Sequence, residues 1–128
     1  MATVGAIKVT TSLSYINGNI GLVNIPSRTQ SITQNTAAPS VSGGTQSIGN
    51  AAHEAIVITE LTTLGVCQFR NMDATNYVEI GVDVAATFYP LVRLNAGEEW
   101  PFRMAQGITP YAQANTAAVI LAKTMLDD

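Results

Sequence analysis

The sequence predicts an all-β protein: a single antiparallel β-sandwich or jelly-roll-like domain with an N-terminal hairpin and an extended polar arm. β-Branched and neutral polar residues dominate, and helical periodicity is nearly absent. Runs with strand character recur about every 8 to 12 residues, separated by turn residues, which is typical of a sandwich. The length of 128 residues is that of one ordinary domain.

Residues 1–26 are expected to form N-terminal strands and a hairpin. Residues 5–11 alternate apolar and polar side chains, as a half-buried strand does. Asn17-Gly18 lies between two strand-like runs, and both residues tolerate the positive φ of a tight hairpin turn. Pro26 is expected to end the second strand or to place its end at a sheet edge.

Residues 27–50 are expected to form a polar loop or arm. The segment is built from Ser, Thr, Gln, Gly and Ala, which supply few large apolar groups for a core. A short strand is expected at residues 29–33. Long loops inside compact domains are uncommon and are usually functional, so we expect this arm to be ordered by a neighbouring protein.

Residues 51–128 are expected to form the sandwich core. Asn71–Asn76 and Asn95–Glu98 have the composition of turns, because Asn and Asp side chains bond their own backbone. Pro90 is expected to bend its strand. The expected strands are residues 55–59, 66–70, 77–82, 87–94, 100–104, 110–114 and 117–125.

The charge content points to protein partners. The net charge is −3, and charged residues make up 12% of the chain, about half the usual proportion. Such a surface loses few hydrated ions when it is covered by another protein. The six basic residues are scattered, whereas nucleic-acid binding needs clusters of Lys and Arg, so we expect no nucleic-acid partner.

The residues that carry chemistry are too few to suggest an enzyme. His53 is the single histidine and Cys67 the single cysteine, so neither a zinc site nor an intrachain disulfide is expected. Glu98 and Glu99 are adjacent and would point to opposite faces of a strand, which does not suit a carboxylate dyad. Nucleotide-binding glycine motifs are missing from the sequence. We therefore expect no catalytic residue, no cofactor and no metal.

Residues 1–5 lack the features of a signal peptide, and the sequence has no apolar run of the roughly 20 residues that a membrane helix needs. We therefore expect synthesis in a reducing, cytosol-like compartment and no contact with a membrane. Cys67 lies in a strand-like run and is expected to be a small buried residue.

The second half of the chain resembles small virion structural proteins of tailed bacteriophages. The resemblance covers about residues 65–125 and consists of turns and strands without a catalytic signature. Its theme is an Arg-Asn-x-Asp-x-Thr-Asn turn, a V-E-I-G strand, an F-x-P-x-x-x-L strand, a G-E turn and a Y-A-x-A strand. These fall at Arg70–Asn76, Val78–Gly81, Phe88–Leu94, Gly97-Glu98 and Tyr111–Ala114.

The resemblance implies a subunit of the virion, assembled in the host cytoplasm and present in many copies. A capsid decoration or cement protein is the first expectation. The alternatives are a neck, tail or baseplate subunit, or a glycan- or receptor-binding module. The implied partners are the major capsid protein, other virion proteins and copies of the chain itself, as a trimer or higher oligomer. The residues expected at the interface, besides the arm, are Arg70, Asn71, Asp73, Asn76, Asn95, Glu98 and Trp100. For Trp100, which lies beside Pro101 and Phe102, packing in the core is the default expectation and an interface anchor the alternative.

Overall fold

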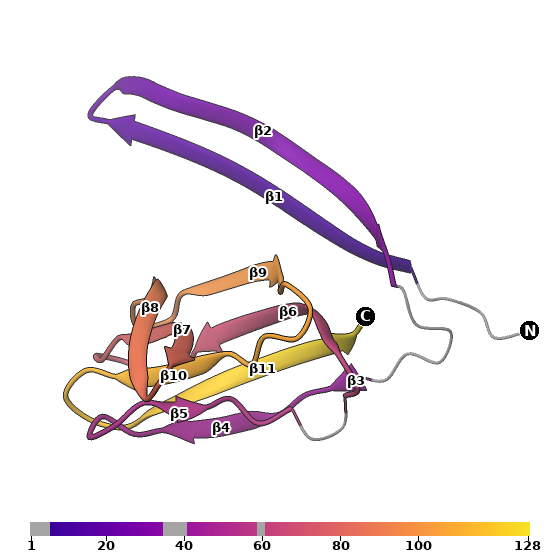
Figure 1. Cartoon of the computed structure of the whole chain (residues 1–128). Coiled ribbons are helices and arrows are strands. Elements are labelled where there is room, and N and C mark those ends of the chain that lie inside the picture. The colour runs from indigo at the N-terminus through magenta and orange to yellow at the C-terminus, as the bar shows by residue number, and fades with distance from the viewer. Residues whose placement is uncertain (1–5, 35–40, 59–60) are drawn as a thin grey trace, which may run out of the picture. The chain divides into compact units, whose positions relative to one another are not determined.

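The computed structural model describes residues 6–34, 41–58 and 61–128. These form two compact units, residues 1–38 and residues 39–128, which we describe one at a time. The first is a long β-hairpin, and the second, called the body below, is a β-sandwich (Figure 1).

The hairpin consists of β1 (Ala6–Asn17) and β2 (Ile20–Thr33), which pair antiparallel from Ala6 and Thr33 to Asn17 and Ile20. Gly18 and Asn19 form its two-residue turn. The Asn17-Gly18 pair predicts a turn here, and the observed turn lies one residue further along the chain. Gly18 has a φ of 62°, the positive value that a type II′ turn requires at its first central residue.

Pro26 does not end the second strand, contrary to expectation. β2 continues through it to Thr33, so the short strand expected at residues 29–33 is present, but as part of the hairpin rather than of a polar arm. The register explains why: Leu13 pairs with Ile25 but Thr11 pairs with Arg28, so two residues of β2 face one of β1. This is a β-bulge, one of the few places where a sheet accepts a proline.

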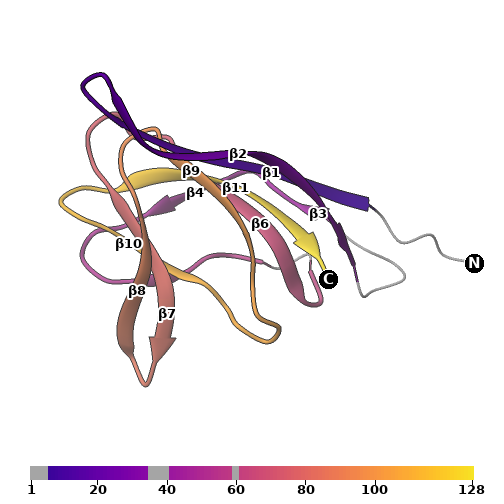
Figure 2. The ribbon, with the colours of Figure 1, turned by 90° about the horizontal axis from the view of Figure 1, so that it is seen from above.

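The body contains two antiparallel sheets packed face to face, which confirms the predicted sandwich. The first sheet has the order β5-β10-β7-β8, and the second has β3-β11-β6-β9 with β4 also paired to β11. Figure 2 shows β7 and β8 running across the direction of β6 and β11. The strands of the first sheet are β5 (Glu54–Ala55), β7 (Val78–Val84), β8 (Thr87–Leu94) and β10 (Tyr111–Ala114). Those of the second are β3 (Val41–Ser42), β4 (Thr45–Ile48), β6 (Leu64–Asn71), β9 (Glu99–Arg103) and β11 (Val119–Asp127).

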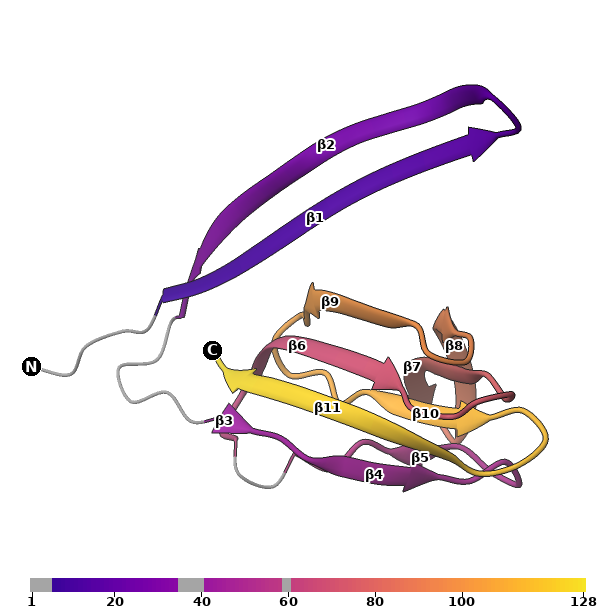
Figure 3. The same cartoon turned by 180° about the vertical axis from the view of Figure 1, so that it is seen from behind.

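The end of the expected polar arm belongs to the sandwich. β3 and β4 both pair with β11, which therefore lies between β6 and β4 (Figure 3). Ile48, at the end of β4, is fully buried in the core. A segment of small polar residues can form a strand here because Ile48 supplies the apolar group and β11 supplies the pairing. Residues 35–40 of the expected arm lie outside the described residues.

The strands predicted between residues 66 and 125 are present, with boundaries within a few residues of those expected. The strand expected at residues 55–59 is not: β5 stops at Ala55, and residue 59 lies outside the described residues. Ile56 instead donates its backbone N–H to the Pro110 carbonyl and buries its side chain in the core. Burial of an apolar run therefore did not require a strand.

The two sides of the sandwich differ. On one side, Gln46 of β4 bonds the backbone of residues 55 and 57, and Lys123 reaches the Val57 carbonyl at 2.8 Å, so the edges near β4 and β5 are tied together. On the other side lie β8 and β9, each of which pairs on one side only within the described strands. The second side is the more open, and it carries the site described next.

Candidate functional site

Asn71 joins the two turns in which most of the predicted interface residues lie. Its backbone N–H donates to the Glu98 carbonyl at 2.9 Å, and its carbonyl accepts from Gly97 N–H at 3.0 Å. Its side-chain amide donates to the carbonyls of Asn76 and Leu94, and its Oδ1 accepts from Asp73 N–H. A buried amide with every polar group bonded rigidifies the structure around it.

This arrangement gives Asn71 an internal role. It is fully buried, so it is not part of the surface of the body, although the sequence suggested it as an interface residue. The polar side chain at the end of a strand was read correctly as a turn signal. That signal could not show whether the amide would face solvent or a second turn brought next to it by the fold.

Asp73 and Asn76 shape the first turn. The Asp73 carboxylate accepts hydrogen bonds from the backbone N–H groups of Asn76, at 2.6 Å, and Thr75, at 3.0 Å. These bonds, that from Asn76 first, hold the pKa of Asp73 below its ordinary value of 3.8. The Asn76 side chain accepts from the Thr116 hydroxyl at 2.7 Å. Both residues are half-buried, and their polar atoms are largely engaged within the chain.

Asn95, Glu98 and Arg70 are exposed. Asn95 N–H donates to a Glu98 carboxylate oxygen at 2.9 Å, and Glu98 N–H donates to the Asn95 carbonyl at 3.0 Å, so the second turn is closed from both ends. The structure thus brings the two predicted turns together through Asn71, and leaves these three side chains available at the surface beside them.

Trp100 lies at the mouth of an apolar cavity between the edges of the two sheets. Its ring is 44% exposed and stacks on Phe102, with centroids 4.8 Å apart, while Phe102 contacts the buried Phe69. The cavity has a volume of about 390 Å³ and is much more apolar than polar. Its lining includes Leu91, Val92, Trp100, Phe102, Met104 and Ile108. We call this feature the β8–β9 opening.

Leu91 is the most exposed large apolar residue of the opening, at 74%. It is exposed because of a bulge: Ile80 pairs with Val92 but Gly81 pairs with Pro90, so Leu91 has no partner across the β7–β8 ladder. The sequence predicted a bend at Pro90. It did not reveal that the bend turns a leucine outward beside Trp100.

Pro101 limits how another strand can pair with the edge of β9. Met104 N–H bonds the Gly65 carbonyl of β6, so by the alternation of a strand the nitrogen of Pro101 points to the unpaired side of β9. An edge that lacks a donor there resists continuous strand addition. The opening is therefore better suited to receiving apolar side chains than to extending a ladder.

The hairpin also has an exposed apolar surface. The register places Ile7, Val9, Leu13 and Tyr15 of β1 on one face together with Val23, Ile25 and Ile32 of β2, and Thr11, Arg28 and Gln30 lie among them on the same face. Leu13 is 59% exposed, Tyr15 53% and Ile25 47%. Thr10 and Thr29 lie on the opposite face, where their hydroxyls bond at 2.7 Å. We call the first surface the apolar face of the hairpin. The alternation at residues 5–11 predicted a half-buried strand, but a local pattern could not show that the register gathers apolar residues of both strands on one exposed face.

Charge separates the two units. Residues 1–38 contain Lys8 and Arg28 and no acidic residue, which makes their net charge +2. The other four basic residues and all nine acidic residues lie in 39–128, which gives that part a net charge of −5. The net charge of −3 conceals this division of charge between the two units.

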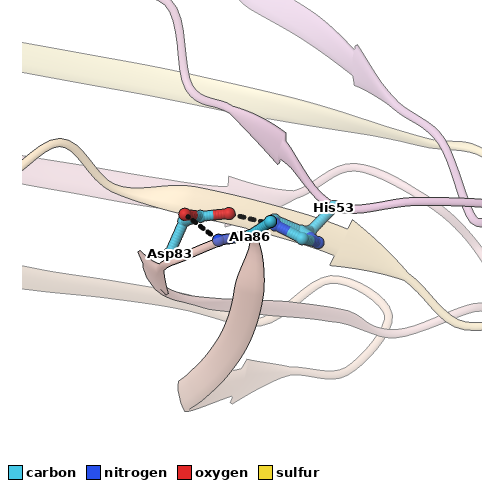
Figure 4. Close-up of polar contacts among 3 residues, drawn as sticks. All are labelled: His53, Asp83 and Ala86. Atoms are coloured by element: carbon cyan, nitrogen blue, oxygen red, sulfur yellow. Dashed lines mark hydrogen bonds and ion pairs between the residues drawn. The ribbon is translucent and has the colours of Figure 1, made fainter.

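His53 lies in a small cluster on the body. Its Nε2 is 2.5 Å from Asp83 Oδ2, and Ala86 N–H donates to the other Asp83 oxygen at 3.2 Å (Figure 4). The imidazole stacks on Phe88, with centroids 5.3 Å apart, and its tilted neighbour is Tyr111. A His–Asp pair can orient a proton acceptor, but catalysis also needs a reacting group beside it. The contacts described here instead connect the segment before β5 to the β7–β8 turn.

Cys67 is buried, and burial raises the pKa of its thiol to about 12. It is therefore a packing residue, as the sequence predicted. Among the described residues, no three His, Cys, Asp or Glu side chains are grouped as a metal site would require.

The Tyr77 ring is covered on one face by the Arg93 guanidinium, 3.9 Å from the ring centroid. Trp100, by contrast, is 44% exposed. The described part of the chain also contains no helix with the length and apolarity needed to span a membrane.

No protein-family model, curated protein or solved structure matches this chain.

Proposed function

We propose that this protein is a structural subunit of a virus particle, most specifically a decoration or cement protein of a tailed-bacteriophage head, which acts through protein–protein contacts. The observation that carries the proposal is the pair of apolar surfaces, one on the hairpin and one at the β8–β9 opening. Isolated monomers seldom expose large contiguous apolar surfaces, whereas assembly proteins use them.

Three further features support a contact role. A two-stranded hairpin is at best marginally stable in water, so one as long as β1–β2 needs a partner surface. Charged residues make up only 12% of the chain, which lowers the desolvation energy of a large interface. The residues that carry the resemblance to virion proteins, such as Asn71, Gly81 and Pro90, hold turns and bulges in place and thus preserve the framework of the sandwich.

The test is the position and number of copies in purified particles. We expect quantitative mass spectrometry to give a copy number matching the capsid lattice, and particles lacking the protein to release DNA at lower temperature. The variant Leu13→Ser/Ile25→Ser should bind such particles more weakly, whereas the polar-face control Ser14→Thr/Asn24→Thr should bind normally. A single ring of copies would place the protein at the neck or tail instead, and absence from every particle would refute the proposal.

A second candidate is a glycan- or receptor-binding module. The observation in its favour is Trp100, 44% exposed beside a cavity of about 390 Å³, since exposed aromatic rings stack on sugar faces and form binding hot spots. Binding to a glycan array that disappears in Trp100→Ala, with the unfolding midpoint unchanged, would favour this role. A variant that is simply unfolded would show that Trp100 acts in packing.

A further inference from the structure

We infer that the partner of the hairpin is a second copy of this chain: its apolar face covers the β8–β9 opening of a neighbouring body, so that copies associate head to tail. This deepens and rests on the proposed function, because it names the contact through which a particle subunit would join its neighbours.

The two surfaces are chemically complementary. The hairpin offers Leu13, Tyr15 and Ile25, all about half exposed, and the opening offers Leu91 and Trp100 around an apolar cavity. The hairpin carries +2 and the body −5, so this pairing is attractive, whereas two hairpins would repel each other. Pro101 at the edge of β9 disfavours strand addition, so the hairpin is expected to bind through the side chains of its apolar face.

The length of the hairpin argues that a neighbouring copy takes part in covering it. The 12 residues of β1 extend about 40 Å at about 3.4 Å per residue. A compact body of residues 39–128 has a radius of gyration of about 12 Å, which corresponds to a sphere about 30 Å across. One body cannot cover the whole hairpin. The tip, where Ile16, Ile20 and Leu22 are 66%, 64% and 55% exposed, would remain in water unless a second copy covers it.

The size of the contact favours closed assemblies over isolated pairs. A body about 30 Å across covers about 30 Å of two strands that lie about 4.8 Å apart, which gives a footprint of roughly 300 Å² per partner, or about 600 Å² in total. That lies below the roughly 1,200 Å² of a stable interface. In a head-to-tail ring, each copy binds one neighbour through its hairpin and another through its β8–β9 opening, so it takes part in two such contacts. A heterologous contact of this kind closes into a ring or continues as an open filament, and closing the ring adds one more contact without adding a copy.

The first experiment is a complementation of two full-length variants, followed by sedimentation velocity. Leu13→Ser/Ile25→Ser makes the apolar face of the hairpin polar, and Leu91→Asp places a charge at the β8–β9 opening. The wild type should form trimers or larger species, and each variant alone should be monomeric. Because each variant retains the surface that the other lacks, their mixture should form one-to-one dimers at high protein concentration, and these dimers, held by a single contact, should dissociate more readily than the wild-type assemblies. Ser14→Thr/Asn24→Thr, on the polar face, should assemble like the wild type.

Results of other kinds would overturn the inference. If Leu91→Asp remains oligomeric while the hairpin variant is monomeric, hairpins pair with each other. If the mixture stays monomeric, or if the wild type is monomeric at high concentration, copies do not associate in this way.

The second experiment identifies the contact by cross-linking. Tyr15→Cys and Leu91→Cys chains are mixed and treated with a short bismaleimide, to which the buried Cys67 is poorly accessible. Cross-linked dimers should form, and replacing either chain by Ser14→Cys or Ile120→Cys, which is exposed on another strand, should reduce them strongly. A Tyr15→Cys/Leu91→Cys double variant that gives only internally linked monomers would show that the hairpin covers its own body, and would refute the inference.

These experiments separate the inference from the proposed function. A chain that binds virus particles but stays monomeric by itself refutes only the head-to-tail contact. A chain that forms head-to-tail assemblies but is absent from particles refutes only the role in the virion.

Discussion

At the residue scale, Gly81 shows how one position determines a bulge. A Cβ atom there would meet the backbone of the facing strand, with the Pro90 Cα only 2.7 Å away. Backbone atoms cannot move aside as a flexible side chain can. The glycine of the V-E-I-G segment is thus required by the Pro90–Leu91 bulge opposite it, which turns Leu91 toward the opening.

We expect Gly81→Ala to lower the free energy of unfolding by about 2–3 kcal/mol, the cost of forcing extra volume into a packed site. Urea unfolding measures this. Gly43→Ala is the matched control, since its Cβ would meet only the Lys123 carbonyl oxygen at an ordinary 3.6 Å. An equal loss in the two variants would contradict the role given to the bulge.

Asp73 makes stability depend on pH. Hydrogen bonds from the N–H groups of Asn76 and Thr75 lower the pKa of its carboxyl below 3.8. Because the pKa is lower in the folded state, the carboxylate stabilises the fold at pH values above the ordinary pKa. This stabilisation is lost as the pH falls through the pKa of the folded state. The difference in unfolding free energy between wild type and Asp73→Asn should therefore be constant near neutral pH and shrink below pH 3.8. Urea unfolding over an acid series tests this, and a constant difference at every pH would contradict it.

At the scale of elements, the β7–β8 turn is strained. Its two central residues, Ala85 and Ala86, have φ values of 51° and 67°, which alanine adopts only at a cost of about 1–2 kcal/mol each. Positive φ values at both central residues are typical of a type I′ turn, for which Asn-Gly is the preferred sequence. The Asp83 carboxylate, which accepts from Ala86 N–H and contacts His53, helps to hold this conformation.

Replacing the pair with Ala85→Asn/Ala86→Gly should raise the free energy of unfolding by about 1–2 kcal/mol, because the backbone strain is removed. Thermal and urea unfolding would both report it. Ala96→Gly serves as control: Ala96 is exposed in a turn without a positive φ, so glycine there should be neutral or slightly destabilising. No gain in the double variant would show that the turn relaxes in solution.

At the scale of the whole molecule, charge is divided between the hairpin and the body, +2 against −5. Salt screens such an attraction, since the Debye length falls from about 10 Å at 0.1 M to about 3 Å at 1 M. Self-association should therefore weaken several-fold over that range without disappearing, because apolar contact supplies most of the affinity. Sedimentation at a series of salt concentrations measures the trend.

The variant Lys8→Gln/Arg28→Gln provides the comparison. It should associate more weakly than the wild type at low salt and respond little to added salt, because the positive charges of the hairpin are gone. A salt response equal to that of the wild type would indicate that these charges do not face the acidic body.

The strand pattern, the turns at residues 71–76 and 95–98 and the burial of Cys67 could be predicted from the sequence, because strand alternation and turn chemistry are local properties. Asn71 and Leu91 could not be assigned correctly in the same way. Whether a side chain is buried or exposed at a strand end depends on which other loop the fold places beside it. The bulges at Pro26 and Pro90 likewise depend on the partner strand.

The small, polar residues 41–48 show the same contrast between local sequence signals and contacts set by the fold, here for a whole segment. Their composition indicated a loop, yet β11 gives them a ladder, so tertiary pairing outweighs a weak local preference. Composition alone established that the chain is poor in charge, and the local alternation of apolar and polar residues predicted that it is rich in strands. The tertiary structure alone decided where the apolar surplus is left exposed, on one face of the hairpin and at the β8–β9 opening, because exposure is decided by contacts between residues far apart in the chain.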